Sequence, residues 1–347
     1  MSAQGRPARI APKCDSAQGS PVNANDHPYS ALTPDCVLDA LDSVGIRGDG
    51  RMLALGSYEN RVYQVFRDDE PPVVAKFYRP ARWTDAQIQE EHAFVAELAE
   101  SEIPAVAAID IAGRTLHEFA DFRFAVFPKR GGRAPELEQP ATLAHLGRYI
   151  GRLHTVGARH EFLHRPALTV ESFGDESREF LLERGFIPAD LLPAWTSVVD
   201  QALLGVRRAY ETYRAATIRL HGDCHGGNVL WTDDGPHFVD FDDARSGPAI
   251  QDLWMLLSGE RAAMEAQLAI VLEGYETLRD FDRRELALIE PLRTLRLVHY
   301  SAWLARRWHD PAFPAAFPWF NTQRYWQDRI LELREQIALM EEPPLSA

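Results

Sequence analysis

The part of the sequence with the most chemical content is residues 221–243. It opens on a His-Gly-Asp run in which the aspartate, Asp223, is followed after four residues by an asparagine, Asn228. A turn at residues 233–236 then leads into an apolar segment that ends at a second aspartate, Asp240. This order and spacing are typical of loops that transfer a phosphoryl group from ATP to a hydroxyl group.

Each of these side chains has a role that follows from its chemistry. Asp240 offers a hard anionic oxygen to Mg²⁺, and Asn228 offers a neutral oxygen ligand. Asp223 can accept a hydrogen bond from the acceptor hydroxyl and orient it for in-line attack. We therefore expect Asp223 and Asp240 to be catalytic, Asn228 and Asp240 to bind Mg²⁺, and His221 to brace the loop.

An upstream lysine is the candidate for contact with the ATP phosphates. Lys76 lies inside an apolar strand pattern, where a buried ammonium is costly unless an anion compensates it. The α- and β-phosphates and a helix carboxylate would supply that charge. Glu91 is the expected carboxylate because it shares a helix face with Phe94 and Leu98, and Glu90 is the alternative.

A turn at residues 56–60 provides a second candidate ATP contact. It contains one glycine and Ser57, and its backbone N–H groups would cover phosphates if the turn joins two strands. A single glycine does not make the Gly-x-Gly-x-x-Gly loop of many nucleotide-binding proteins. The prediction that Ser57 contacts ATP therefore depends on the rest of the site.

The elements that must position these residues fall into two groups. Residues 29–127 combine strand patterns with a short helix that begins at Pro34 and a second helix that begins near Thr84. Pro and Gly in residues 128–135 indicate a hinge. Residues 136–347 are mainly helical. The sequence therefore predicts an α+β, bilobal, protein-kinase-like fold with its ligand between the lobes. The strands are expected at 52–66, 73–78, 103–111 and 122–127.

The helical lobe begins with a clear apolar stripe. Leu143, Leu146, Ile150 and Leu153 recur at helical spacing. Asp252, early in a later helix, is a candidate for bracing the catalytic loop. Further helices are expected at residues 175–185, 190–215, 250–278 and 285–308.

The amino-acid composition limits which binding partners and which cellular compartment are expected. The formal net charge of -14 argues against nucleic acid or anionic lipid as a partner, and it would suit a cationic acceptor. No segment approaches the ~20 uncharged apolar residues that span a bilayer. Three cysteines without regular spacing fit a reducing, cytoplasmic environment, with Cys224 as a packed thiol. Residues 1–28 show no apolar period, so we expect a disordered extension.

Several longer stretches resemble one bacterial family across residues 30–346. They lie at residues 57–63, 74–83, 220–231, 242–257, 311–314 and 342–345. The chain is similar to the stress response kinase A family, within the wider aminoglycoside phosphotransferase and choline kinase group. These long motifs are specific to that family rather than to kinases in general.

The resemblance implies a function and a set of roles. It implies a cytoplasmic, monomeric serine/threonine protein kinase that uses ATP and Mg²⁺ and acts in oxidative and envelope stress. It implies Asp223 as proton acceptor, Asn228 and Asp240 as magnesium ligands, and Ser57 as an ATP contact. Its partners would be ATP and a protein substrate with a serine or threonine hydroxyl.

The sequence departs from ordinary protein kinases after Asp240. Asp242 stands where the third position of the motif is usually glycine, and few residues separate Asp240 from Asp252. A long phosphorylatable activation loop does not fit in that interval. We therefore expect no switching by phosphorylation between residues 240 and 252.

Three other functions compete with the protein-kinase interpretation. A small-molecule kinase acting on an amino alcohol, sugar or aminoglycoside would use the same ATP and metal residues. A catalytically silent ATP-binding module would keep the fold, although the intact Lys76, Asp223, Asn228 and Asp240 weigh against it. A metal hydrolase would use the alternating His221, Asp223 and His225, but a zinc site needs a further ligand cluster that the sequence does not offer.

Overall fold

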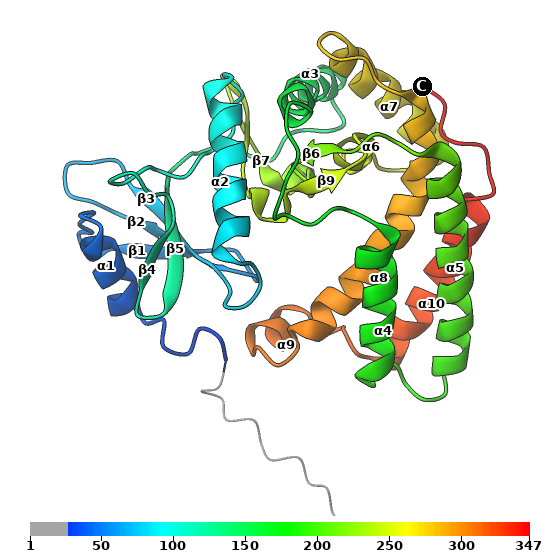
Figure 1. Cartoon of the computed structure of the whole chain (residues 1–347), viewed down its shortest axis with the longest axis horizontal. Coiled ribbons are helices and arrows are strands. Elements are labelled where there is room, and N and C mark those ends of the chain that lie inside the picture. The colour runs from blue at the N-terminus through cyan, green and yellow to red at the C-terminus, as the bar shows by residue number, and fades with distance from the viewer. Residues whose placement is uncertain (1–26) are drawn as a thin grey trace, which may run out of the picture.

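The computed structural model describes residues 27–347, which form a small lobe built on a sheet and a larger helical lobe (Figure 1). This arrangement confirms the predicted α+β bilobal fold. Most of the extension predicted to be disordered, residues 1–28, lies outside the described residues. Tyr29 is already buried, and its hydroxyl donates to the carbonyl oxygens of Glu59 and Phe77.

The small lobe contains a five-stranded antiparallel sheet of order β1-β2-β3-β5-β4. The strand expected at residues 52–66 is divided in two by the turn at residues 56–60. Lys76 lies in the central strand, opposite Val62 on one side and Ala125 on the other. The strands are β1 (Met52–Leu55), β2 (Arg61–Val65), β3 (Val73–Phe77), β4 (His117–Phe119) and β5 (Phe122–Pro128).

Two helices accompany this sheet, α1 (Pro34–Ser43) and α2 (Asp85–Glu100). Thr84 caps α2 in a capping box with Gln87, as its position in the sequence indicated. The prediction of a strand at residues 103–111 was wrong. That segment forms only isolated bridges, and Pro104 has no backbone N–H to donate to a ladder.

The large lobe is built on helices around one extended apolar core. The single helix expected at residues 250–278 is interrupted at residues 255–260, where Gly259 has a φ of +89°. The last long helix was not anticipated. The helices are α3 (Pro140–Gly157), α4 (Glu176–Glu183), α5 (Leu192–Tyr213), α6 (Ile250–Trp254), α7 (Arg261–Glu276), α8 (Ile289–Arg306), α9 (Ala312–Ala316) and α10 (Gln323–Leu339).

Helices α3 and α7 are in backbone contact because glycines face each other across the interface. A Cβ on Gly147 would lie 2.0 Å from the carbonyl oxygen of Val271, and one on Gly274 would lie 2.0 Å from that of Ala144. No side chain fits at such a distance. The buried leucine stripe of α3 confirms the predicted core-facing helix.

Two short antiparallel pairs present the catalytic segment. Strand β6 (Ile218–Leu220) pairs with β9 (Arg245–Gly247), and β7 (Val229–Thr232) pairs with β8 (Gly235–Phe238). Because the pairs are antiparallel, residues 221–228 and 239–244 meet at one end of both. Within residues 27–347, no helix has the length and apolar character needed to cross a membrane.

Candidate active site

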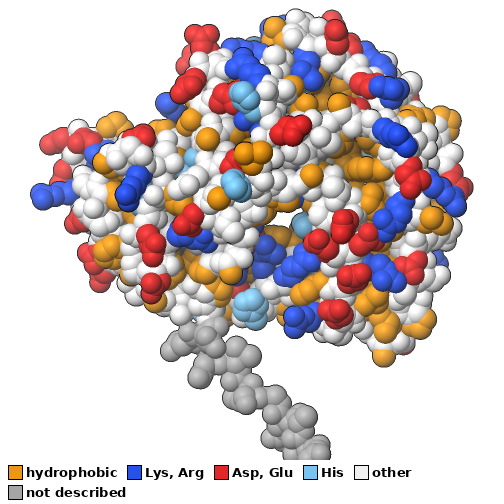
Figure 2. Space-filling view, in the orientation of Figure 1, with side chains coloured by type: hydrophobic (Ala, Val, Ile, Leu, Met, Phe, Trp, Pro, Cys, Tyr) orange, Lys and Arg blue, Asp and Glu red, His pale blue; other side chains and the backbone are white. Residues whose placement is uncertain are grey.

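A cavity of about 440 Å³ lies where the two lobes meet, and Figure 2 shows the surface hollowed there. Residues of the β1–β2 turn, the catalytic segment and α8 line it. Four of the sequence-predicted site residues line it together, namely Ser57, Asp223, Asn228 and Asp240. Residues far apart in the sequence therefore share one concave site, as a nucleotide between two lobes requires.

Lys76 does not line the cavity itself, but from the central strand it contacts two carboxylates that do. Its Nζ atom lies 3.0 Å from Oδ1 of Asp240 and 3.1 Å from Oδ1 of Asp242. Burial by itself would lower the pKa of Lys76, but the two carboxylates hold that pKa well above its ordinary value. The ammonium is therefore charged and points toward the predicted magnesium ligand.

The expected ion pair between Lys76 and Glu91 is not formed, which corrects the predicted partner. Asp242, at the position where kinases usually have glycine, occupies that place instead. Glu91 is only 2% exposed, and its Oε2 atom has no hydrogen-bond partner among the described residues. Burial raises the pKa of Glu91 to about 7, and the nearby charge of Lys76 opposes that rise.

Glu90, the alternative partner, has a different role. Its carboxylate accepts hydrogen bonds from the backbone N–H groups of Leu163, His164 and Arg165, at 2.5, 2.9 and 2.7 Å. It therefore ties α2 to the segment between α3 and α4, and it does not contact Lys76.

Asp223 is surrounded by donors from two elements. Nη1 of Arg296, on α8, donates to its Oδ1 at 2.8 Å, and Nε2 of His225 lies 3.4 Å from its Oδ2. The amide nitrogen of Asn228 donates to the backbone oxygen of Asp223 at 3.0 Å. Burial opposes ionisation, but His225 and Arg296 hold the pKa of Asp223 below its usual range.

The catalytic loop is braced as its sequence indicated. Asp252 accepts hydrogen bonds from the backbone N–H groups of His221 and Gly222, at 2.8 and 2.9 Å, and lies 3.1 Å from Nε2 of His154. Nε2 of His221 lies 2.9 Å from the carbonyl oxygen of Val239. This confirms the bracing roles of Asp252 and His221.

Glycine is required at one position of this loop. Gly222 has a φ of +84°, and a Cβ there would lie 2.1 Å from the carbonyl oxygen of Asp243. Any other residue would push the two halves of the site apart. Cys224, next to Asp223, is buried and packed, as predicted.

The oxygens expected to bind Mg²⁺ are suitably presented. The carboxylate of Asp240 is about half exposed toward the cavity, on a backbone with a φ of 59° and a ψ of 61°. Asn228 uses its amide nitrogen on Asp223, which leaves its Oδ1 as a free acceptor among the described hydrogen bonds. Mg²⁺ typically takes one or two protein oxygens and completes its octahedron with phosphates and water, so these residues fit it.

No cluster in the described part of the chain brings together three or more His, Cys, Asp or Glu side chains that would hold a metal by themselves. Two protein oxygens are nevertheless the arrangement that a phosphate-bound Mg²⁺ uses.

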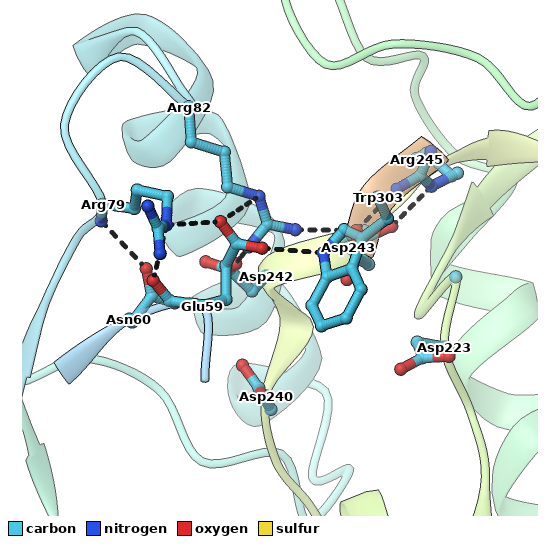
Figure 3. A network of polar contacts seen from close by, with 12 residues as sticks. Glu59, Asn60, Arg79, Arg82, Asp223, Asp240, Asp242, Asp243, Arg245 and Trp303 are labelled. Atoms are coloured by element: carbon cyan, nitrogen blue, oxygen red, sulfur yellow. Dashed lines mark hydrogen bonds and ion pairs between the residues drawn. The ribbon is translucent and has the colours of Figure 1, made fainter. Parts of the chain in front are cut away.

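A network of arginines and carboxylates around the β1–β2 turn was missed from the sequence (Figure 3). Glu59 contacts Nε of Arg79 at 3.1 Å, accepts from Nε1 of Trp303 at 2.7 Å, and pairs with Arg307. Arg82 pairs with Asp242 and, at 3.0 Å, with Asp243. The available signal was the arginine cluster directly after the lysine strand.

Comparisons with known proteins agree with this geometry. The phosphotransferase enzyme family matches residues 52–289. Stress response kinase A of Salmonella choleraesuis and that of Escherichia coli K12 are each 45% identical to this chain over 93% of it and 98% of their own length. The serine/threonine protein kinase RdoA of Salmonella typhimurium matches with the same identity and coverage.

Solved structures resemble the chain in fold. An amicoumacin kinase in complex with AMP-PNP, Ca²⁺ and its ligand has a TM-score of 0.66 at 18% identity, covering 86% of this chain and 90% of its own. A microcompartment-associated aminopropanol kinase has a TM-score of 0.61 at 19% identity, with coverages of 84% and 91%. The kinase-like cavity and the 45% identity to these kinases agree: the chain belongs to the phosphotransferase enzyme family, within the group of proteins named stress response kinase A.

Proposed function

We propose that the chain is a cytoplasmic, monomeric protein kinase that uses ATP and Mg²⁺, phosphorylates serine or threonine hydroxyls of proteins and acts in protection from oxidative and envelope stress. The observation that carries the kinase chemistry is the convergence of Asp223, Asn228 and Asp240 in one cavity, with Lys76 against Asp240. The choice of protein substrate is supported by the 45% identity to relatives named as stress response and serine/threonine protein kinases.

The proposed chemistry assigns one task to each group. Asn228 and Asp240 would hold Mg²⁺, which would neutralise charge on the phosphates. Asp223 accepts the proton of the acceptor hydroxyl while the oxygen of that hydroxyl forms a bond to the γ-phosphorus. The bond between that phosphorus and the β–γ bridging oxygen breaks, and ADP leaves. Lys76 and the β1–β2 turn, with Ser57, would hold the phosphates.

A second candidate is transfer to a small molecule. The structural neighbours named as amicoumacin and aminopropanol kinases motivate it, although at 18–19% identity they share the fold alone. Their ATP chemistry would be the same, so the acceptor decides between the two functions.

The direct test is transfer of labelled γ-phosphate by the wild type and D223A, with casein-like protein and a panel of amino alcohols, sugars and aminoglycosides as acceptors. We expect labelled protein with the wild type and a loss of label with D223A. Label in the small molecules alone would overturn the protein-kinase proposal. No transfer to any acceptor, together with intact ATP binding, would favour a silent ATP-binding module.

A further inference from the structure

Aromatic side chains line the part of the cavity next to Arg296. Tyr300 stacks on Trp303 with ring centroids 5.6 Å apart, and Phe173 stacks on His299 at 4.0 Å. Arg296 lies one helical turn before Tyr300 on α8, and both line the cavity with Asp223. Aromatic walls accept many shapes, so the charge of the acceptor is selected by the ionic groups.

The carboxylates that line the cavity are already paired with cations. They are Glu59, Asp223, Asp240, Asp242 and Asp243. Their cationic partners are Arg79 and Arg307 for Glu59, Arg296 for Asp223, Lys76 for Asp240 and Asp242, and Arg82 and Arg245 for Asp243. Among the described lining residues, no carboxylate is left over to bind an ammonium group, despite the net charge of the chain.

Arg296, by contrast, has unused donors. Its guanidinium carries five N–H donors, and the contact with Asp223 is the one hydrogen bond it makes within the described residues. Its side chain is 42% exposed, so the remaining donors are open to a ligand in the cavity. A planar guanidinium binds a carboxylate through two parallel hydrogen bonds.

We propose that the acceptor carries an anionic group beside its hydroxyl, and that Arg296 is the positioning residue that binds it. Resting on the proposed protein-kinase function, this assigns the substrate as a serine or threonine flanked by an acidic side chain. Because the bond to Asp223 uses one of five donors, Arg296 can hold the anionic group and Asp223 at the same time, which places the acceptor hydroxyl beside the proton acceptor.

The test uses three peptides that are identical except for the residues next to a single serine, which are aspartate, asparagine or lysine. The rates are measured with labelled ATP for the wild type, R296Q and R296E. We expect the wild type to prefer the aspartate peptide over the lysine peptide by about tenfold or more in kcat/KM, the size of one charge-assisted hydrogen bond. R296Q abolishes this preference and R296E reverses it.

A matched control separates this role from general charge effects. Arg324 on α10 is 88% exposed and pairs with Asp328, so R324E makes the same charge change away from the cavity. R324E is expected to keep the wild-type preference. In R296Q the loss of anion binding raises KM for the aspartate peptide without raising KM for the lysine peptide, which a purely structural role would not do.

The outcomes distinguish this inference from the proposed function. Equal rates of the wild type on all three peptides would overturn the acidic-acceptor inference and leave the protein-kinase function standing. If only small molecules are phosphorylated, the protein-kinase function fails. The inference is then decided by a matched pair of acceptors, a hydroxy acid and an amino alcohol. Preference for the amino alcohol would overturn it.

Discussion

Asp223 meets two opposing demands, since its side chain is only 24% exposed and yet must be ionised to accept a proton. Arg296 and His225 stabilise its charged form, so the pKa of Asp223 stays below its usual range. The spacing in the sequence predicted Asp223, Asn228 and Asp240 because the motif is local. It did not predict Arg296, which lies 73 residues further along the chain and reaches Asp223 only through the packing of α8.

The first prediction concerns Asp223 itself. D223N keeps the shape of the side chain and removes its ability to accept the hydroxyl proton. We expect kcat to fall by roughly 10²–10⁴-fold, the usual contribution of a positioned base. KM for ATP should change little, because Asp223 does not hold the phosphates in the proposed arrangement. Steady-state kinetics test this, and an unchanged kcat would contradict it.

The second prediction concerns the buried Glu91. Its pKa of about 7 in the folded protein, against 4.5 as the ordinary value, means that the folded state binds more protons between these pH values. The contribution of Glu91 to stability is therefore present below pH ~4.5 and is lost as the pH rises through ~7. E91Q remains neutral throughout.

We therefore expect the difference in unfolding free energy, wild type minus E91Q, to fall by the order of 1–3 kcal/mol between pH 5 and pH 8. Urea unfolding of both proteins at each pH measures it. Because Glu285 also has a pKa raised to about 7 by burial, only the difference between the two proteins reports on Glu91. A difference that is constant with pH would refute the assignment.

At the scale of elements, short segments rather than long helices hold the catalytic loop. The β6–β9 and β7–β8 pairs fix its ends, and the short helix α6 supplies Asp252 beneath it. The sequence located α2 and α3 because their caps and apolar stripes are local. It joined α6 to α7, although the apolar pattern stops at Leu257 and Gly259 gave a local signal for the break.

The third prediction concerns that support. D252A leaves the backbone N–H groups of His221 and Gly222 buried without an acceptor, and each such group costs about 1–3 kcal/mol. We expect a loss of at least about 2 kcal/mol in the free energy of unfolding, with a lower kcat as well. Thermal or urea unfolding measures the first and kinetics the second. Wild-type stability in D252A would show that α6 does not brace the loop.

The interval between Asp240 and Asp252 is short and structured, with the helical turn Phe241–Asp243, strand β9 and the start of α6. Ser246 is the one hydroxyl residue in it. That phosphorylation in this interval does not control activity stays a prediction. Phosphopeptide mapping of the active protein tests it, and an activating phosphate between residues 240 and 252 would refute it.

At the scale of the whole molecule, one network of ion pairs connects the two lobes beside the cavity. Asp310, which follows α8, lies 2.5 Å from Nη2 of Arg79 and 3.4 Å from Nη2 of Arg61. In the opposite sense, the carboxylate of Glu59 in the small lobe pairs with Arg307 of the helical lobe. The order of strands and helices predicted two lobes, but it carried no information about these contacts, which join residues more than 200 positions apart.

The fourth prediction tests this connection. E59Q removes the charge that holds the β1–β2 turn against Arg79 and Arg307. We expect KM for ATP to rise up to about tenfold, the equivalent of one charged hydrogen bond, with a smaller change in kcat. D328N neutralises an exposed carboxylate on α10 and serves as the matched control. Equal KM values in E59Q and D328N would show that the network does not position the turn.

The proposed chemistry requires Lys76, Asp223, Asn228 and Asp240 to converge around one nucleotide. A crystal structure with Mg²⁺ and a non-hydrolysable ATP analogue tests it most directly. We predict the ion on the oxygens of Asn228 and Asp240, the phosphates next to Lys76 and Ser57, and the γ-phosphate facing Asp223. A nucleotide bound elsewhere, or one whose phosphates do not reach Asp240, would contradict the account.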